Sequence, residues 1–133
     1  MALTADRNTL QKEGIDEEIP VAASTTIYAG SLVVTNTSGY AVEAVNTASY
    51  LMAGVSLAAA DNSSGSNGDI NVKVRRKGVF LFAMASAAAT DIGKTVYPSD
   101  GGTVTTTAGN GVVIGKIVKV ESSTSVWVDI DQR

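Results

Sequence analysis

Cysteine and histidine are both absent from this 133-residue sequence. The chain therefore has no disulfide framework and no thiolate, and the common nucleophile–base arrangements of enzymes cannot be built from its side chains. Carboxylates are the remaining acid–base groups, but Glu17 with Glu18 and Asp129 with Asp131 accompany no pocket-like motif. We expect these carboxylates to be solvated, and we expect no cofactor and no catalytic activity.

Charged residues and long apolar runs are also scarce. Only 17% of the residues are charged and the net charge is −3, which argues against a nucleic-acid-binding protein. No stretch reaches the roughly 18 consecutive apolar residues of a membrane span, and residues 1–14 lack the charged-then-apolar pattern of a secretory signal. We therefore expect partners other than nucleic acid or membrane, and synthesis in the cytoplasm of the producing cell.

Short β-prone segments separated by turn residues are what the sequence has in abundance. β-branched and aromatic residues gather at 25–28, 31–35 and 70–74, and Asn36-Thr37-Ser38-Gly39 is a hairpin signal. Several short strands with turn signals every 8–12 residues or so are typical of a small sandwich or barrel. The sequence predicts an all-β fold with one domain over residues 20–133.

Three local features refine this prediction. Val79-Phe80-Leu81-Phe82 is the most hydrophobic run and predicts a central strand. Residues 83–89 predict a short helical turn. Pro20 lacks the N–H that a central strand needs, so it predicts an edge or entry strand. Alternation of apolar residues predicts a core made of Val33, Val42, Val55, Leu57, Val72, Val74, Phe80, Phe82, Val96, Val113, Ile117, Val126 and Val128.

The order of strands, turns and glycines suggests an internal repeat. Residues 29–76 and 92–130 each read as strand, turn, strand, loop and strand. The repeat predicts two similar β units, each burying one face against the other. The glycines that correspond are Gly30 and Gly93, Gly39 and Gly102, and Gly54 and Gly115.

Residues 1–19 differ from the rest of the chain because they are rich in charge and poor in apolar anchors. One interpretation is a frayed terminus. The other is an extended arm that becomes ordered on a neighbouring subunit and contributes affinity in doing so.

The dense basic cluster Lys73–Lys77 also has two interpretations. It could match a carboxylate-rich patch on a partner or symmetry mate, and the acidic residues 16–18 of the chain itself could complement it. Alternatively, it is a solvated strand end. Trp127 alternates with Val126 and Val128, so it points outward or into a contact if those two valines are buried.

The loop Asp61–Asp69 carries oxygen-bearing side chains, as calcium loops do. It lacks the D-x-[DN]-x-[DN]-G order and the closing bidentate glutamate of such loops. We therefore expect no metal site there.

The order of four motifs resembles the small capsid cement, or decoration, proteins of tailed bacteriophages. The motifs are IYAG (27–30), GYAV (39–42), VRRKGVF (74–80) and DIGKTVY (91–97), and the resemblance extends from Ala5 to Ile130. The acidic run 16–18 departs from the family pattern.

This resemblance implies a β-rich structural protein of the virion, without a catalytic site. Such proteins bind the major capsid protein on the outside of the shell as homotrimers or homodimers, with the trimer favoured here, and staple adjacent capsomers. The alternative is a carbohydrate- or ligand-binding β-module on a phage particle. The residues expected to contact partners are Arg7, Asn8, Thr9, Leu10, Lys12, Arg75, Arg76, Lys77 and Trp127.

Overall fold

The computed structural model describes residue 2 and residues 4–131, of which nearly all the regular structure is β. Strands make up 46% and helix 2%, which confirms the predicted all-β class. The strands are β1 (Asp16–Pro20), β2 (Thr25–Ile27), β3 (Leu32–Thr35), β4 (Ala41–Glu43), β5 (Leu51–Ser56), β6 (Ala60–Asn62), β7 (Asn71–Arg75), β8 (Lys77–Ala83), β9 (Thr95–Pro98), β10 (Val104–Thr105), β11 (Gly115–Ser122) and β12 (Ser125–Asp131), with one 3-10 helix, η1 (Ala89–Asp91), before β9.

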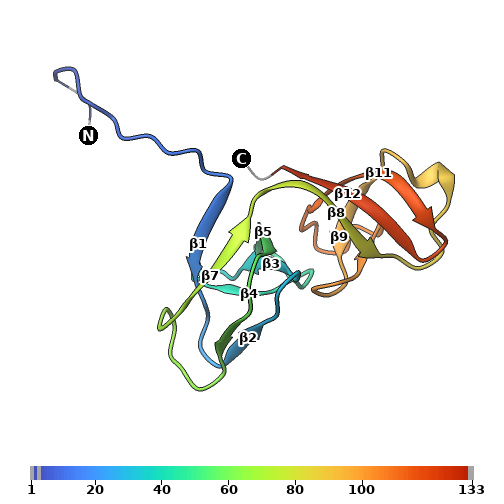
Figure 1. Ribbon diagram of the computed structural model, residues 1–133, viewed down its shortest axis with the longest axis horizontal. Helices are drawn as coiled ribbons and strands as arrows, with labels where there is room; N and C mark the ends of the chain where they lie inside the picture. The colour runs from blue at the N-terminus through green and yellow to red at the C-terminus, as the bar shows by residue number, and fades with distance from the viewer. Residues whose placement is uncertain (1, 3, 132–133) are drawn as a thin grey trace.

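The strands form two five-stranded antiparallel sheets and one two-stranded ribbon. The first sheet has the order β1-β7-β5-β3-β4, and the second has the order β8-β12-β11-β9-β10. The sheets pack as a sandwich in which one sheet curves into a half-barrel. The β2–β6 ribbon lies at the other end of the molecule from the second sheet (Figure 1).

The two sheets have the same connectivity. Each sheet contains a hairpin, which is β3–β4 in the first sheet and β9–β10 in the second. The following strand, β5 or β11, pairs with the first strand of that hairpin. The next strand of the sheet, β7 or β12, then pairs with β5 or β11. The fifth strand, β1 or β8, precedes its hairpin in the chain and pairs beyond the last of these strands. This order of pairing follows the strands of the predicted repeat, although the proposed duplication of the sequence itself stays a prediction.

The first sheet is buried on both faces. Successive side chains along a strand point to opposite faces, so one strand can contribute to two different cores. Leu32 and Val34 of β3 pack into a core shared with the second sheet, together with Val96 and Ile130. Val33, which points the other way, packs with residues of β2, β6 and β7 into a second core. Two separate hydrophobic clusters therefore hold three layers together.

Glycine is required where strands approach most closely. A Cβ at Gly54 in β5 would lie 2.4 Å from the carbonyl oxygen of Arg75, and a Cβ at Gly115 in β11 would lie 2.0 Å from that of Asp129. Both distances are far inside van der Waals contact. The corresponding glycines of the predicted repeat thus admit a neighbouring backbone in each sheet.

Several local predictions were wrong. The hydrophobic run 79–82 forms β8, which is an edge strand of the second sheet and not a central one. Leu57 and Val113 are exposed, since Leu57 follows the end of β5 and Val113 lies in the loop before β11. Residues 83–88 are not helical, and Ala89 is the only residue of the predicted turn that belongs to η1, which is the one helical turn among the described residues. Pro20 lies in β1, an edge strand, as predicted.

Candidate partner-binding surface

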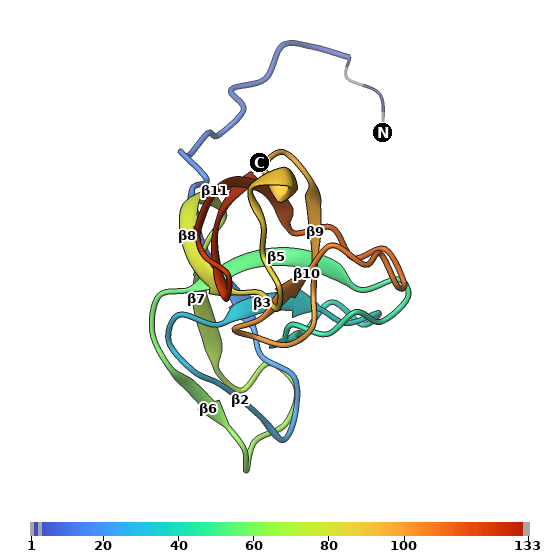
Figure 2. The same ribbon diagram turned by 90° about the vertical axis from the view of Figure 1, so that its right-hand side faces the viewer.

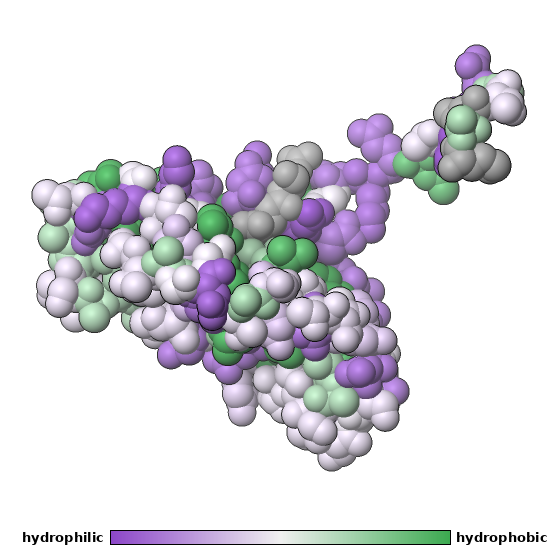
Figure 3. Space-filling model, turned by 180° about the vertical axis from the view of Figure 1, so that it is seen from behind, coloured by the Kyte–Doolittle hydropathy of each residue, from purple (hydrophilic) through white to green (hydrophobic). Residues whose placement is uncertain are grey.

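The segment before β1 projects from the body of the molecule (Figure 1). Residues 4–13 are all exposed, and Leu10 retains 89% of its accessible surface. Figure 3 shows mostly hydrophilic atoms along the part of this segment nearest the body. We name residues 4–13 the arm. It carries five of the predicted contact residues, namely Arg7, Asn8, Thr9, Leu10 and Lys12. The predicted boundary at residue 19 falls inside β1, and residues 1 and 3 lie outside the described part of the chain.

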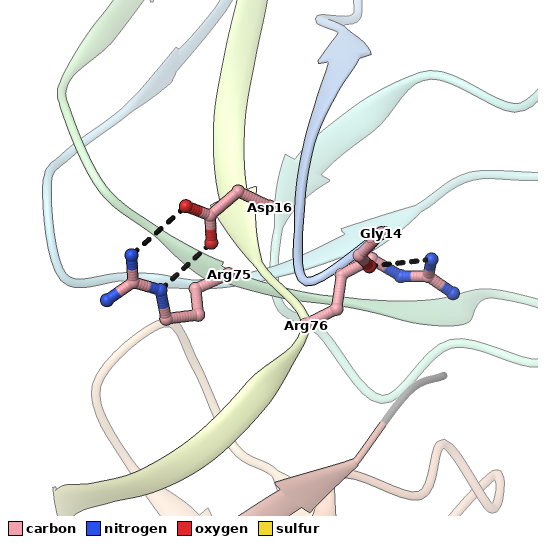
Figure 4. A network of polar contacts seen from close by, with 4 residues as sticks. All are labelled: Gly14, Asp16, Arg75 and Arg76. Carbon is pink, nitrogen blue, oxygen red and sulfur yellow. Dashed lines mark hydrogen bonds and ion pairs between the residues drawn. The ribbon is translucent and has the colours of Figure 1, made fainter. Parts of the chain in front are cut away.

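The arm joins the body at a network of polar contacts that we name the arm root, made of Gly14, Ile15, Asp16, Arg75 and Arg76. Arg75 donates from Nε to Asp16 Oδ1 at 2.9 Å and from Nη2 to Asp16 Oδ2 at 3.0 Å. The backbone N–H of Arg76 donates to the carbonyl oxygen of Ile15 at 2.7 Å, and its guanidinium donates to that of Gly14 at 3.4 Å (Figure 4). Consecutive arginines therefore hold consecutive residues at the base of the arm.

The pairing register explains why these charges meet. β1 runs antiparallel to β7, so that Asp16 lies opposite Arg75 and Glu18 lies opposite Lys73. The bidentate hydrogen bond from Arg75 lowers the pKa of Asp16, and the same contact raises the pKa of Arg75. Lys12 adds a contact of 2.7 Å from its Nζ to Glu17 Oε2. The acidic residues of the chain thus complement its own basic cluster.

The structure divides the predicted basic residues by role. Arg75 and Arg76 bind residues 14–16 of their own chain, at the base of the arm. Lys77 begins β8 and lies opposite Asp131 in the register of β8 and β12. Recognition of a partner's carboxylates by these residues stays a prediction. The sequence alone could not assign the pairing of Arg75 with Asp16, because the two residues are far apart in the chain.

Trp127 lies on the outer face of the second sheet, opposite the buried Val126 and Val128. Its indole Nε1 donates to Glu121 Oε2 at 2.9 Å, and the Nζ of Lys119 lies 3.4 Å from the same oxygen. The hydrogen bond from Trp127, followed by the charge of Lys119, lowers the pKa of Glu121. The residue is half-buried and lies beside Leu81 of β8.

The loop 61–69 uses its side-chain oxygens to organise itself. Asp61 Oδ1 accepts hydrogen bonds from the Thr26 hydroxyl at 3.1 Å and from the Ser63 N–H at 3.0 Å, and the contacts with Ser63 and Thr26 lower the pKa of Asp61. Asp69 Oδ2 accepts from the Ser66 N–H at 2.8 Å. Within residue 2 and residues 4–131, no three acidic side chains gather as a metal site would require.

Comparisons with family models, with curated proteins and with solved structures give no match for this chain. In the part of the chain that the structure describes, no helix has the length and apolar character needed to cross a bilayer.

Proposed function

We propose that the chain is a structural protein of a phage virion that binds the outer surface of the major capsid shell and stabilises it by bridging adjacent capsomers. The observation that carries the proposal is the exposed arm, which is held at its root and carries Leu10 well away from the body. The resemblance of four ordered motifs to capsid cement proteins supports the same function.

An arm of this kind bridges subunits by reach. Ten extended residues span roughly 33 Å, which is enough for the body to rest on one capsid subunit while the arm contacts another. Separation of the two subunits must then break both contacts, and standard protein interfaces bury about 1,600 Å² in total. Many copies on one shell oppose the outward pressure of the packaged genome together.

The arm root lowers the cost of this binding. A disordered segment loses conformational entropy when it folds on a partner. Because Gly14, Ile15 and Asp16 are already held by Arg75 and Arg76, the direction of the arm is set before it meets the shell. Arg7, Asn8, Thr9, Leu10 and Lys12 are the side chains we assign to the contact.

Electron microscopy of capsid shells from the phage that encodes the chain tests the proposal. Shells lacking this protein are incubated with the full chain or with a variant from which residues 1–13 are deleted. We expect added density on the shell exterior for the full chain and none for the deletion variant, while both unfold at similar temperatures. Shells that acquire no density with the full chain would refute the proposed function.

A ligand-binding module is the second candidate, and Trp127 is the observation that favours it. An aromatic ring with one accessible face beside polar side chains is a common element of sugar sites, and the half-buried Trp127 lies beside Lys119 and Glu121. Saturable binding on a glycan array that is lost in Trp127→Ala would support this candidate over capsid binding.

A further inference from the structure

The edge formed by β8 is unusually apolar for a free sheet edge. β8 is the terminal strand of the second sheet and lies at its rim (Figure 2). Val79 is 50% exposed and Leu81 is 47% exposed on the outer face. Proteins normally protect such edges with charges, prolines or bulges, yet residues 78–83 contain no charge and no proline, and β8 pairs with β12 without a register shift.

The backbone of this edge is available for pairing at two residues. The N–H of Ala83 donates to the carbonyl oxygen of Gly102 at 3.1 Å, so Ala83 directs its N–H away from β12. In an antiparallel pair, every second residue directs its backbone groups to the same side. The N–H and C=O groups of Leu81 and Val79 therefore point out of the sheet edge.

The surface behind the edge carries balanced charges. Trp127 lies beside Leu81, and Asp129 lies beside Val79. On β11, Lys116 is opposite Asp129, and Lys119 forms an ion pair with Glu121. Two cations and two anions thus neutralise one another within one chain, so a second copy of the same surface meets no excess of like charge.

We propose that β8 pairs antiparallel with β8 of a second copy, about a two-fold axis at Phe80. Val79 of each copy then lies opposite Leu81 of the other, and the two pairs exchange about four backbone hydrogen bonds. The paired segment ends at Leu81, because Gly102 and Thr103 already lie against the edge at Ala83. The pairing covers the half-buried Phe80 at the rim of the core. It also brings Val79 and Leu81 of both copies together on the outer face. Each copy thus uses the same patch, as a self-complementary two-fold interface requires.

This interface deepens the proposed function by naming the surface for self-association, and it favours the dimer over the trimer that the family resemblance favoured. Light scattering on the isolated full chain tests it without any capsid. We expect a dimer for the unmodified chain and a folded monomer for Leu81→Lys. The control Ile92→Lys, at a residue that is 54% exposed after η1, should remain dimeric.

Cysteine cross-linking tests the register directly, because the chain contains no cysteine of its own. Val79→Cys and Leu81→Cys chains are mixed under reducing conditions and then oxidised. The mixture should form the mixed disulfide, since a hydrogen-bonded pair has Cα atoms about 5.5 Å apart. Each variant alone should stay uncrosslinked, because identical positions lie more than about 7 Å apart.

A monomeric or trimeric unmodified chain, or efficient cross-linking of Val79→Cys alone, would overturn the inference. Neither result would affect capsid binding by the arm, which the shell experiment measures separately. A Leu81→Lys chain that fails to fold leaves the cross-linking result to decide.

Discussion

Single atoms decide how closely the strands of this molecule approach one another. Gly54 and Gly115 occupy corresponding places in β5 and β11, and in each case the missing Cβ makes room for a carbonyl of the neighbouring strand. Open space alone does not require glycine, as Gly102 shows: a Cβ there would meet only Asp100 Oδ1, at 3.9 Å. The role of a glycine therefore follows from what surrounds it.

Gly115→Ala tests this argument. The added Cβ would lie 2.0 Å from the carbonyl oxygen of Asp129, so β11 or β12 must shift. We expect a loss of about 2 kcal/mol in the free energy of unfolding, measured by chemical denaturation. Gly102→Ala is the matched control and should change that free energy by less than about 0.5 kcal/mol. Equal stability of the two variants would show that the strands can separate at no cost.

Asp91 makes the stability of the chain depend on pH. Its Oδ2 accepts the Ala88 N–H at 2.9 Å, and its Oδ1 accepts Lys94 Nζ at 3.0 Å. The hydrogen bond from Ala88, followed by that from Lys94, lowers the pKa of Asp91 in the folded state. A lowered pKa stabilises the fold above the unfolded-state value of about 4, and this contribution is lost as the pH falls through the folded-state value.

We therefore expect Asp91→Asn to lower the unfolding temperature most at neutral pH. The difference from the unmodified chain should shrink below about pH 4, where the carboxylate of the unmodified chain also becomes protonated. Thermal unfolding followed by circular dichroism at several pH values measures this. Asp6→Asn, on the exposed arm, is the control. A constant difference across the pH range would exclude the ionised carboxylate as the cause.

Among the secondary-structure elements, the loops after β4 and β10 connect the two sheets by hydrogen bonds. Asn46 lies in the loop after β4, and residues 108–112 lie in the corresponding loop after β10. Asn46 Nδ2 donates to the Ala108 carbonyl at 2.8 Å, and Asn46 Oδ1 accepts the Val112 N–H at 3.2 Å. The Asn110 side chain returns a hydrogen bond of 2.8 Å to the Asn46 carbonyl. One side chain thus connects the equivalent loops of both sheets.

Asn46→Ala should cost about 1–2 kcal/mol of unfolding free energy, because it leaves the Ala108 carbonyl and the Val112 N–H without this partner. Thr47→Ala, at the exposed neighbouring residue, should be close to neutral. Denaturant titration measures both variants. If Asn46→Ala matched Thr47→Ala in stability, the loop contact would not contribute to the association of the sheets.

Local chemistry made some elements predictable and left others open. The turn at 36–39 and the edge position of Pro20 follow from the backbone preferences of those residues, so the sequence predicts them. The position of β8 does not follow from its hydrophobicity, because an apolar run fits a buried central strand or an interface edge equally well. The contacts of Arg75 with Asp16 depend on strand register, which single residues do not reveal.

At the scale of the whole molecule, the arm and the β8 edge have complementary roles. The arm is proposed to bind the shell, and the edge is proposed to join two copies. A dimer would carry two arms, and the second arm would bind at the high effective concentration set by the first. Affinity for a shell would then depend on β8 even though β8 is not among the residues that we assign to the capsid contact.

Leu81→Lys is therefore expected to weaken binding to shells without altering the arm. If the two arms of a dimer engage neighbouring sites together, the monomeric variant should bind about 100-fold more weakly than the unmodified chain. Co-sedimentation with shells over a range of protein concentrations measures the apparent Kd. Ile92→Lys should bind like the unmodified chain, and deletion of residues 1–13 should abolish binding in either background. Equal affinity of Leu81→Lys and a demonstrably dimeric unmodified chain would mean that each arm binds the shell independently.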